Sequence, residues 1–161
     1  MTHAELSELR RIPRERGMAG ASRASDYGAI PMREHLEQSN REITLAVMVE
    51  DLPALAEIDA IAATEGVDIV AVGPSDMSRA LGVGGTSDHP KLVDVIHRVA
   101  EAVQKGGVAR LALPMNHATF PRNAVQLREL GVGYTNCAPS PEVRMLRSMQ
   151  TQVAEARELL T

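Results

Sequence analysis

From residue 43 onward, the sequence alternates between short apolar runs and longer segments whose apolar residues recur at helical spacing. The apolar runs have the length and composition of strands buried on both faces of a parallel sheet, and they cover residues 43–49, 67–72, 108–113 and 132–135. The intervening segments predict helices over 52–64, 77–81, 90–105, 120–130 and 141–160. This order predicts an α/β fold of about four βα units, with crossover helices joining parallel strands over residues 43–160.

The segment before residue 43 lacks this alternation. A short helix is expected over residues 3–10. It should end before Pro13, because proline disfavours helix in the residue that precedes it. Residues 14–31 are rich in Gly and polar residues and predict a long loop, of a kind that is usually either functional or disordered. A helix is expected over residues 32–40. We interpret residues 1–161 as a single domain.

Size and composition restrict the function further. The 161 residues fall short of the roughly 250 that a complete (β/α)8 barrel needs. A formal net charge of −4 offers no basic face for nucleic acid, and no apolar run reaches the roughly 20 residues of a membrane span. The N-terminus has no apolar core of a signal peptide, and one cysteine cannot form an internal disulfide. We therefore expect a cytoplasmic protein without a nucleic-acid or membrane partner.

Acidic residues follow two successive predicted strands. Glu50 and Asp51 end the first run, and Asp76 follows the second. Because parallel strands end at one edge of the sheet about 4.8 Å apart, Glu50 and Asp76 could share one divalent cation. The alternative is that each acid only caps the helix that follows it.

The turn after the second strand, Gly73-Pro74-Ser75-Asp76, has the composition of an anion site. Glycine permits a close backbone approach, proline stiffens the turn, and Ser75 and Asp76 present backbone N–H groups at a helix start. An ordinary βα turn explains the same residues. Among the histidines, His89 is expected to be a helix cap or a surface residue. His117 lies near a strand end, where it could face the site, but it has no identifiable partner.

Three stretches together resemble the HpcH/HpaI aldolase/citrate lyase family, and more closely its metal-dependent class II pyruvate aldolases, which cleave 4-hydroxy-2-oxo-dioates. They are residues 16–28, Val47-Met48-Val49-Glu50-Asp51, and 66–78 with the Gly73-Pro74-Ser75-Asp76-Met77-Ser78 motif. The stretch from Leu81-Gly82 to Asp88-His89-Pro90 agrees as well. The resemblance covers roughly residues 9–160 and corresponds to the C-terminal half of the family's barrel, which implies a partial (β/α)8 TIM barrel here.

The resemblance implies a site and a reaction. The family's metal ligands fall on Glu50 and Asp76, which would hold Mg²⁺, Mn²⁺ or Co²⁺. The pyruvyl carboxylate would meet the turn of Gly73, Pro74, Ser75 and Asp76, and Leu113 would line the substrate pocket. The implied activity is that of a carbon–carbon lyase: retro-aldol cleavage of a 4-hydroxy-2-oxo acid to pyruvate and an aldehyde.

The family's catalytic Arg and active-site His lie in the first half of the barrel, and no residue of this chain matches them. An alternative is therefore an incomplete fragment or assembly module that keeps the metal and carboxylate site without turnover. An isolated half-barrel also leaves two sheet edges exposed. The expected partner is either a second copy, with exchange of the C-terminal helix over 141–160, or a separate N-terminal half.

Overall fold

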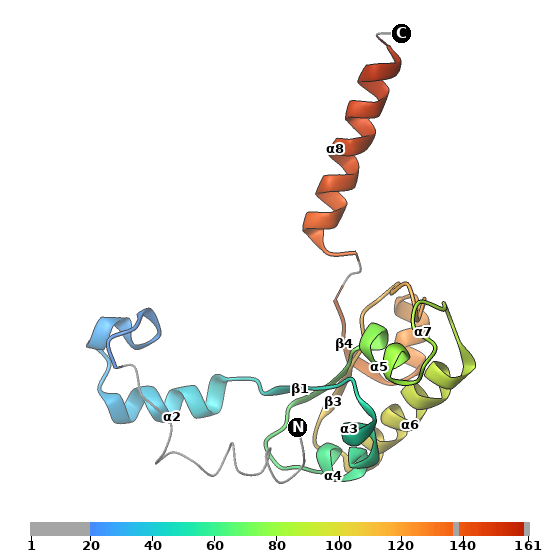
Figure 1. The fold of residues 1–161 in the computed structure, drawn as a ribbon. Coiled ribbons are helices and arrows are strands. Elements are labelled where there is room, and N and C mark those ends of the chain that lie inside the picture. Colours follow the sequence, from blue (N-terminus) through green and yellow to red (C-terminus); the bar gives the residue numbers. More distant parts are fainter. Residues whose placement is uncertain (1–19, 137–138, 160–161) are drawn as a thin grey trace.

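Four parallel strands form the centre of the molecule. A computed structural model describes residues 20–136 and 139–159. The strands are β1 (Ala46–Val49), β2 (Ile69–Val72), β3 (Arg110–Ala112) and β4 (Val132–Tyr134), in the spatial order β1-β2-β3-β4 (Figure 1). All neighbours pair in parallel, so the predicted four-unit α/β order is confirmed. The helix expected over 3–10, the start of the 14–31 loop and Cys137 lie outside the described residues.

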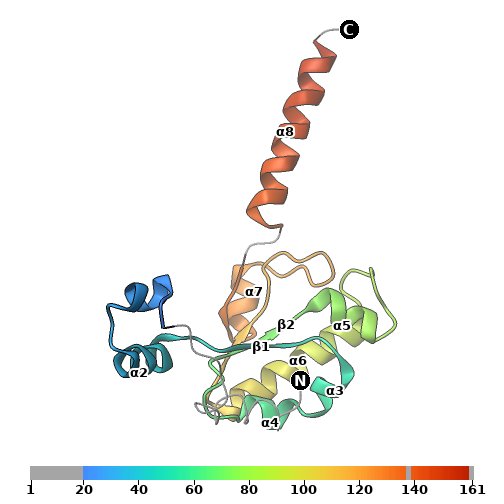
Figure 2. The same ribbon diagram turned by 60° about the vertical axis from the view of Figure 1, so that its left-hand side comes forward.

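Helices precede, connect and follow these strands. They are η1 (Arg23–Gly28, a 3-10 helix), α2 (Met32–Glu42), α3 (Leu52–Ala56), α4 (Ile58–Ala62), α5 (Pro74–Ala80), α6 (Pro90–Gly106), α7 (Ala124–Glu129) and α8 (Pro141–Glu158). Figures 1 and 2 show α3–α7 packed close to the sheet, whereas α2 and α8 extend away from it. No helix among the described residues is long and apolar enough to cross a membrane.

Several predicted boundaries were wrong. The helix predicted over 52–64 is divided at Glu57, whose φ of −101° and ψ of 12° interrupt the helical backbone. The helix predicted over 120–130 begins only at Ala124, because Asn123 forms a capping box with Gln126 and fixes the start there. The predicted 14–31 loop contains the 3-10 helix η1.

The hydrophobic core lies between one face of the sheet and the helices. Val47 and Val49 of β1 point toward it, and Val70 of β2 and Leu111 of β3 continue the same face in register. Helix α6 contributes a buried stripe that consists of Leu92, Ile96, Val99, Ala100, Ala102 and Val103. Burial of this aliphatic area at about 25 cal/mol per Å² is the main stabilising contribution to the fold.

Close packing of α4 against α6 explains the glycine pair that ends α6. A Cβ atom at Gly106 would lie 2.6 Å from the carbonyl oxygen of Ala62, so only glycine fits there without a backbone shift. Gly107 then caps the helix with a φ of 68°, in the left-handed region that glycine adopts readily. At the other end of α6, Nδ1 of His89 accepts a hydrogen bond from the Lys91 backbone N–H at 3.2 Å, so His89 caps the helix.

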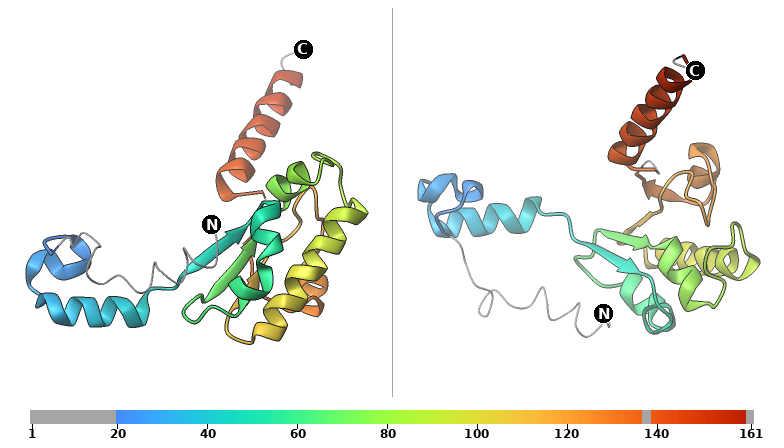
Figure 3. Two further views of the ribbon diagram at one scale, coloured as in Figure 1. Left: turned by 60° about the horizontal axis from the view of Figure 1, so that its bottom comes forward. Right: turned by 45° about the horizontal axis from the view of Figure 1, so that its top comes forward.

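Among the described residues, no helix covers the opposite face of the sheet (Figure 3). Ala46 and Met48 of β1 are exposed, and Met48 keeps 58% of its surface accessible. Ile69 and Ala71, their register partners on β2, are half-buried. The prediction that this strand is buried on both faces is therefore wrong for the described residues, because only the helix side of the sheet has elements packed on it.

Candidate functional site

The two acids after β1 have different roles. Asp51 is the N-cap of α3, and its Oδ1 accepts from the backbone N–H of Ala54 at 2.8 Å. Glu50 precedes this cap and lies exposed at the carboxyl end of β1. The capping alternative therefore applies to Asp51 and not to Glu50, whose carboxylate remains available for a ligand.

The Glu50 carboxylate lies over the end of the neighbouring strand. A Cβ atom at Gly73 would be 3.3 Å from both Cβ and Oε2 of Glu50, and 3.4 Å from Sδ of Met48. Gly73 has a φ of −91° and a ψ of 92°, which any residue can adopt, so the space rather than the backbone dihedrals favours glycine here. The glycine thus leaves a small cradle beside a carboxylate oxygen.

Helix α5 begins directly after this cradle, with Pro74 at its first position. Ser75 and Asp76 occupy the next two positions, where backbone N–H groups have no carbonyl partner within the helix. Asp76 does not cap the helix. Its Oδ1 instead accepts from Nη2 of Arg79, one turn later, at 2.8 Å. The helix predicted from residue 77 therefore starts three residues earlier, at Pro74, and Gly73 is its N-cap.

His117 has a partner that the sequence did not reveal. Its Nε2 lies 3.4 Å from Oγ of Ser75, across 42 positions of the chain. Its Nδ1 lies 3.0 Å from Oγ1 of Thr119 and accepts from the Thr119 backbone N–H at 3.3 Å. Burial lowers the pKa of the His117 imidazole, so the neutral form is favoured. No local motif signals this contact, because it depends on how the 113–123 loop folds back over α5.

Leu113 lies at the end of β3, with only 2% of its surface exposed. Its side chain belongs to the hydrophobic core, and its carbonyl oxygen accepts from Oγ1 of Thr135 at 2.7 Å. The part of Leu113 in substrate binding stays a prediction. The structure thus brings Glu50, Gly73 and the start of α5 together at one edge, whereas the Leu113 side chain is buried in the core.

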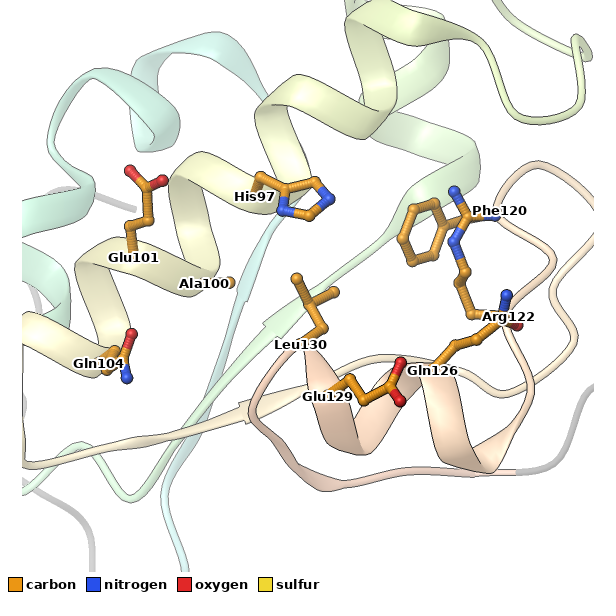
Figure 4. Close-up of a pocket in the computed structure, with 9 residues that line it drawn as sticks. All are labelled: His97, Ala100, Glu101, Gln104, Phe120, Arg122, Gln126, Glu129 and Leu130. Atoms are coloured by element: carbon orange, nitrogen blue, oxygen red, sulfur yellow. The ribbon is translucent and has the colours of Figure 1, made fainter.

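A separate cavity of about 430 Å³ lies between α6 and α7, on the helix-covered side of the sheet (Figure 4). Its lining consists of His97, Ala100, Glu101, Gln104, Phe120, Arg122, Gln126, Glu129 and Leu130. Arg122 is already engaged, since its guanidinium stacks 4.4 Å from the Phe120 ring centre and pairs with Asp88 at 2.7 Å. None of the predicted site residues lines this cavity.

The donor set at the strand ends fits a hard divalent cation. Glu50 and Asp76 offer carboxylate oxygens from adjacent βα units, and Mg²⁺ characteristically takes one or two carboxylates and fills its other positions with water or substrate. Among the described residues, no group of three or more His, Cys, Asp or Glu side chains is placed to hold a metal, so a cage made wholly of side chains is not formed there. The cradle at Gly73 leaves room beside Glu50 Oε2.

Comparison with known proteins decides the family. The model of the HpcH/HpaI aldolase/citrate lyase family matches residues 2–139. The chain belongs to this family. It is 35% identical over 143 residues to a hydroxypyruvate/pyruvate aldolase of Paraburkholderia phytofirmans, covering 89% of this chain and 52% of the relative. It is 36% identical over 142 residues to a 5-keto-4-deoxy-D-glucarate aldolase of Citrobacter koseri, covering 88% and 52%.

A solved structure agrees with the sequence matches. The crystal structure of an HpcH/HpaI aldolase/citrate lyase family protein from Burkholderia cenocepacia J2315 superimposes with a TM-score of 0.75 at 30% identity, covering 96% of this chain and 60% of that one. The fold of this HpcH/HpaI family member is accordingly α/β and part of a (β/α)8-type barrel. The chain spans about half the length of the curated relatives it matches.

Proposed function

We propose that this chain provides the divalent-metal and pyruvyl-binding part of a carbon–carbon lyase, a class II aldolase that cleaves a 4-hydroxy-2-oxo acid to pyruvate and an aldehyde. The family membership supports an aldolase or lyase. The observation that carries the finer proposal is the position of Glu50. Its carboxylate lies over Gly73 and beside the first turn of α5, while Asp51 alone does the capping.

In this proposal Glu50 and Asp76 hold the cation, which would be Mg²⁺, Mn²⁺ or Co²⁺. Such a cation supplies Lewis acidity that stabilises negative charge developing on the 2-oxo oxygen of the substrate. Backbone N–H groups of Ser75 and Asp76 would bind the substrate carboxylate, with Gly73 and Pro74 setting the approach. Cleavage breaks the C3–C4 bond, removes a proton from the C4 hydroxyl and delivers one to C3.

Metal and substrate binding test this proposal directly. We would titrate the chain with Mn²⁺ by electron paramagnetic resonance, and then with pyruvate in the presence and absence of Mn²⁺. We expect Glu50→Gln and Asp76→Asn each to weaken Mn²⁺ binding, because an amide oxygen lacks the charge of a carboxylate. Glu101→Gln on α6 is the matched control and should bind Mn²⁺ like the parent. Equal Mn²⁺ affinity for Glu50→Gln and the parent would refute the site.

Turnover distinguishes an aldolase from the alternative, an incomplete fragment or assembly module. Pyruvate release from 4-hydroxy-2-oxo acids would be followed with Mn²⁺ and again with EDTA. Release that EDTA abolishes supports the aldolase. Binding of Mn²⁺ and pyruvate without any release supports the incomplete module, which fits the family's Arg and His having no counterpart in this chain.

We further propose that other strands complete the barrel in the working protein. The sheet face that no described helix covers carries Met48 and Tyr134, each 58% exposed, and β1 and β4 are the outer strands of the described sheet. Exposed apolar edges of this kind invite pairing with further strands. The strands would come from a second copy of this chain or from a separate N-terminal half. Light scattering distinguishes a homo-oligomer from a monomer that needs the other half.

Helix α8 is the second surface in this assembly proposal. It has no buried residue, and a stripe at helical spacing remains exposed, formed by Val143, Leu146, Met149 and Val153. An amphipathic helix normally packs this stripe on a core, so we propose that it exchanges onto a second subunit. Leu146→Glu should shift light scattering toward the monomer. Ser148→Glu, on the opposite side of the helix, should not.

A further inference from the structure

The loop that carries His117 is held in place by several contacts. Asn116 N–H donates to the Arg122 carbonyl at 2.8 Å and closes the loop on itself. Asp88 N–H donates to the Thr119 carbonyl at 3.0 Å, and Phe120, 1% exposed, anchors the loop in the core. A loop fixed in this way holds His117 against the start of α5 rather than in solvent.

The hydrogen bonds around the ring favour one tautomer. The Thr119 backbone N–H, 3.3 Å from Nδ1 of His117, can only donate, and the Thr119 hydroxyl at 3.0 Å can donate as well, so Nδ1 acts as the acceptor and carries no proton. In the neutral ring the proton is therefore on Nε2, which donates toward Oγ of Ser75 at 3.4 Å. A protonated Nε2 cannot take a proton from Ser75, so this pair is not an activated nucleophile. His117 instead occupies one lone pair of the Ser75 hydroxyl.

This arrangement leaves the hydroxyl proton of Ser75 free to donate to another acceptor. Ser75 stands at the α5 turn, next to Asp76, and is exposed at that edge of the sheet. We propose that His117 is a positioning residue of the strand-end site, which orients the Ser75 hydroxyl so that it donates to the carboxylate of the bound 2-oxo acid. The inference rests on the proposed function, because that function supplies the carboxylate.

A double-mutant cycle on the full chain tests the role. Pyruvate affinity is measured by calorimetry in saturating Mn²⁺ for the parent, His117→Phe, Ser75→Ala and the double variant, with Mn²⁺ affinity measured separately. A hydrogen bond to a charged acceptor predicts about a tenfold loss of pyruvate affinity in each single variant. The double variant should lose no more than either single one, because each substitution abolishes the same oriented hydrogen bond from the Ser75 hydroxyl to the carboxylate. Mn²⁺ affinity should stay within about twofold of the parent.

Two further variants keep the test specific. His117→Gln places an N–H donor near the position of Nε2 and should restore most of the pyruvate affinity that His117→Phe loses. His97→Phe, a histidine on α6 at the other cavity, should bind pyruvate like the parent. Nitrogen chemical shifts of the His117 ring provide a ligand-free measurement, and they should report the proton on Nε2.

The experiments distinguish failure of the proposed function from failure of the role of His117. A parent chain that binds no pyruvate with Mn²⁺ overturns the proposed function and this role together. Parent binding that His117→Phe leaves unchanged overturns only the role of His117. Additive losses in the double variant, a proton on Nδ1, or an equal loss of Mn²⁺ affinity would each show that His117 does not act by orienting Ser75.

Discussion

The ion pair between Asp76 and Arg79 leads to a prediction opposite in sign to every other change at the site. Nη2 of Arg79 lies 2.8 Å from Oδ1 of Asp76, so a cation must compete with the guanidinium for that carboxylate. Removing the competitor by Arg79→Gln should strengthen cation binding. Removing a ligand, as in Glu50→Gln, should weaken it.

The size of the effect follows from the exposure of the pair. The side chains of Arg79 and Asp76 are 79% and 48% exposed, so the pair is worth about 0.2–1 kcal/mol. If the pair must open before the cation binds, it lowers the apparent affinity by about twofold to sixfold. Repulsion between a dication and a guanidinium about 6 Å away adds about 1.4 kcal/mol in water before salt screening. At about 0.01 M salt, where screening over this distance removes only about a fifth of the repulsion, the two effects multiply to an increase of about fifteenfold to fortyfold.

The assay is an Mn²⁺ titration by electron paramagnetic resonance at about 0.01 M and 0.5 M ionic strength, chosen for their different screening lengths. Arg79→Lys is the matched control, since it keeps the positive charge and should stay close to the parent. The gain for Arg79→Gln should shrink at high salt. Unchanged or weaker Mn²⁺ binding by Arg79→Gln at low salt would refute the reasoning that Asp76 is a ligand in competition with Arg79.

Three other predictions concern stability. Gly106→Ala should lower the free energy of unfolding in urea by about 1–3 kcal/mol, despite the better helix propensity of alanine, because its Cβ would lie 2.6 Å from the Ala62 carbonyl. Gly84→Ala, which meets only ordinary contacts at 3.5 Å or more, is the control, and equal stability of the two variants would contradict the packing argument. Asp51→Ala should cost about 1 kcal/mol as a lost helix cap while leaving Mn²⁺ affinity intact, and a parallel loss of Mn²⁺ binding would argue against separate roles for the adjacent acids. Burial lowers the pKa of His117 below the ordinary 6.5, so the unfolded chain binds more protons than the folded chain just below that pH. The free energy of unfolding should therefore fall as the pH drops through 6.5. His117→Gln should flatten this pH dependence.

The sequence predicted the elements with strong local signals. Alternating apolar runs and helical stripes identified all four strands, and Gly107 and His89 marked the ends of α6 correctly. Local sequence signals did not predict the helix boundaries that depend on contacts with distant parts of the chain. Nothing near Glu57 indicates a break. Phe120, predicted to begin a helix, is instead buried from the loop that precedes the Asn123 capping box of α7.

At the candidate site, too, some contacts were predictable from local sequence and others were not. The position of Glu50 beside Gly73 was predictable, because consecutive parallel strands end at one edge and glycine marks a close approach. The pair of Asp76 and Arg79 was visible in principle from their spacing of three on a helix. The contact of His117 with Ser75 was not, since it spans 42 positions and depends on the fold of an irregular loop.

The exposed face of β1 bears on the assembly. The run Ile43 to Val49 has the apolar composition of a strand buried on both faces, yet Met48 and its neighbours face outward beside an edge that no described strand pairs. A strand adapted to one solvated face alternates apolar and polar residues, and β1 (Ala-Val-Met-Val) does not. The composition of β1 therefore favours an environment in which a further layer covers this face. Met48→Lys should then disrupt the complete assembly, as measured by light scattering, while it leaves the unfolding free energy of the separate chain nearly unchanged. A large loss of stability in the separate chain would instead mean that its own residues already cover this face.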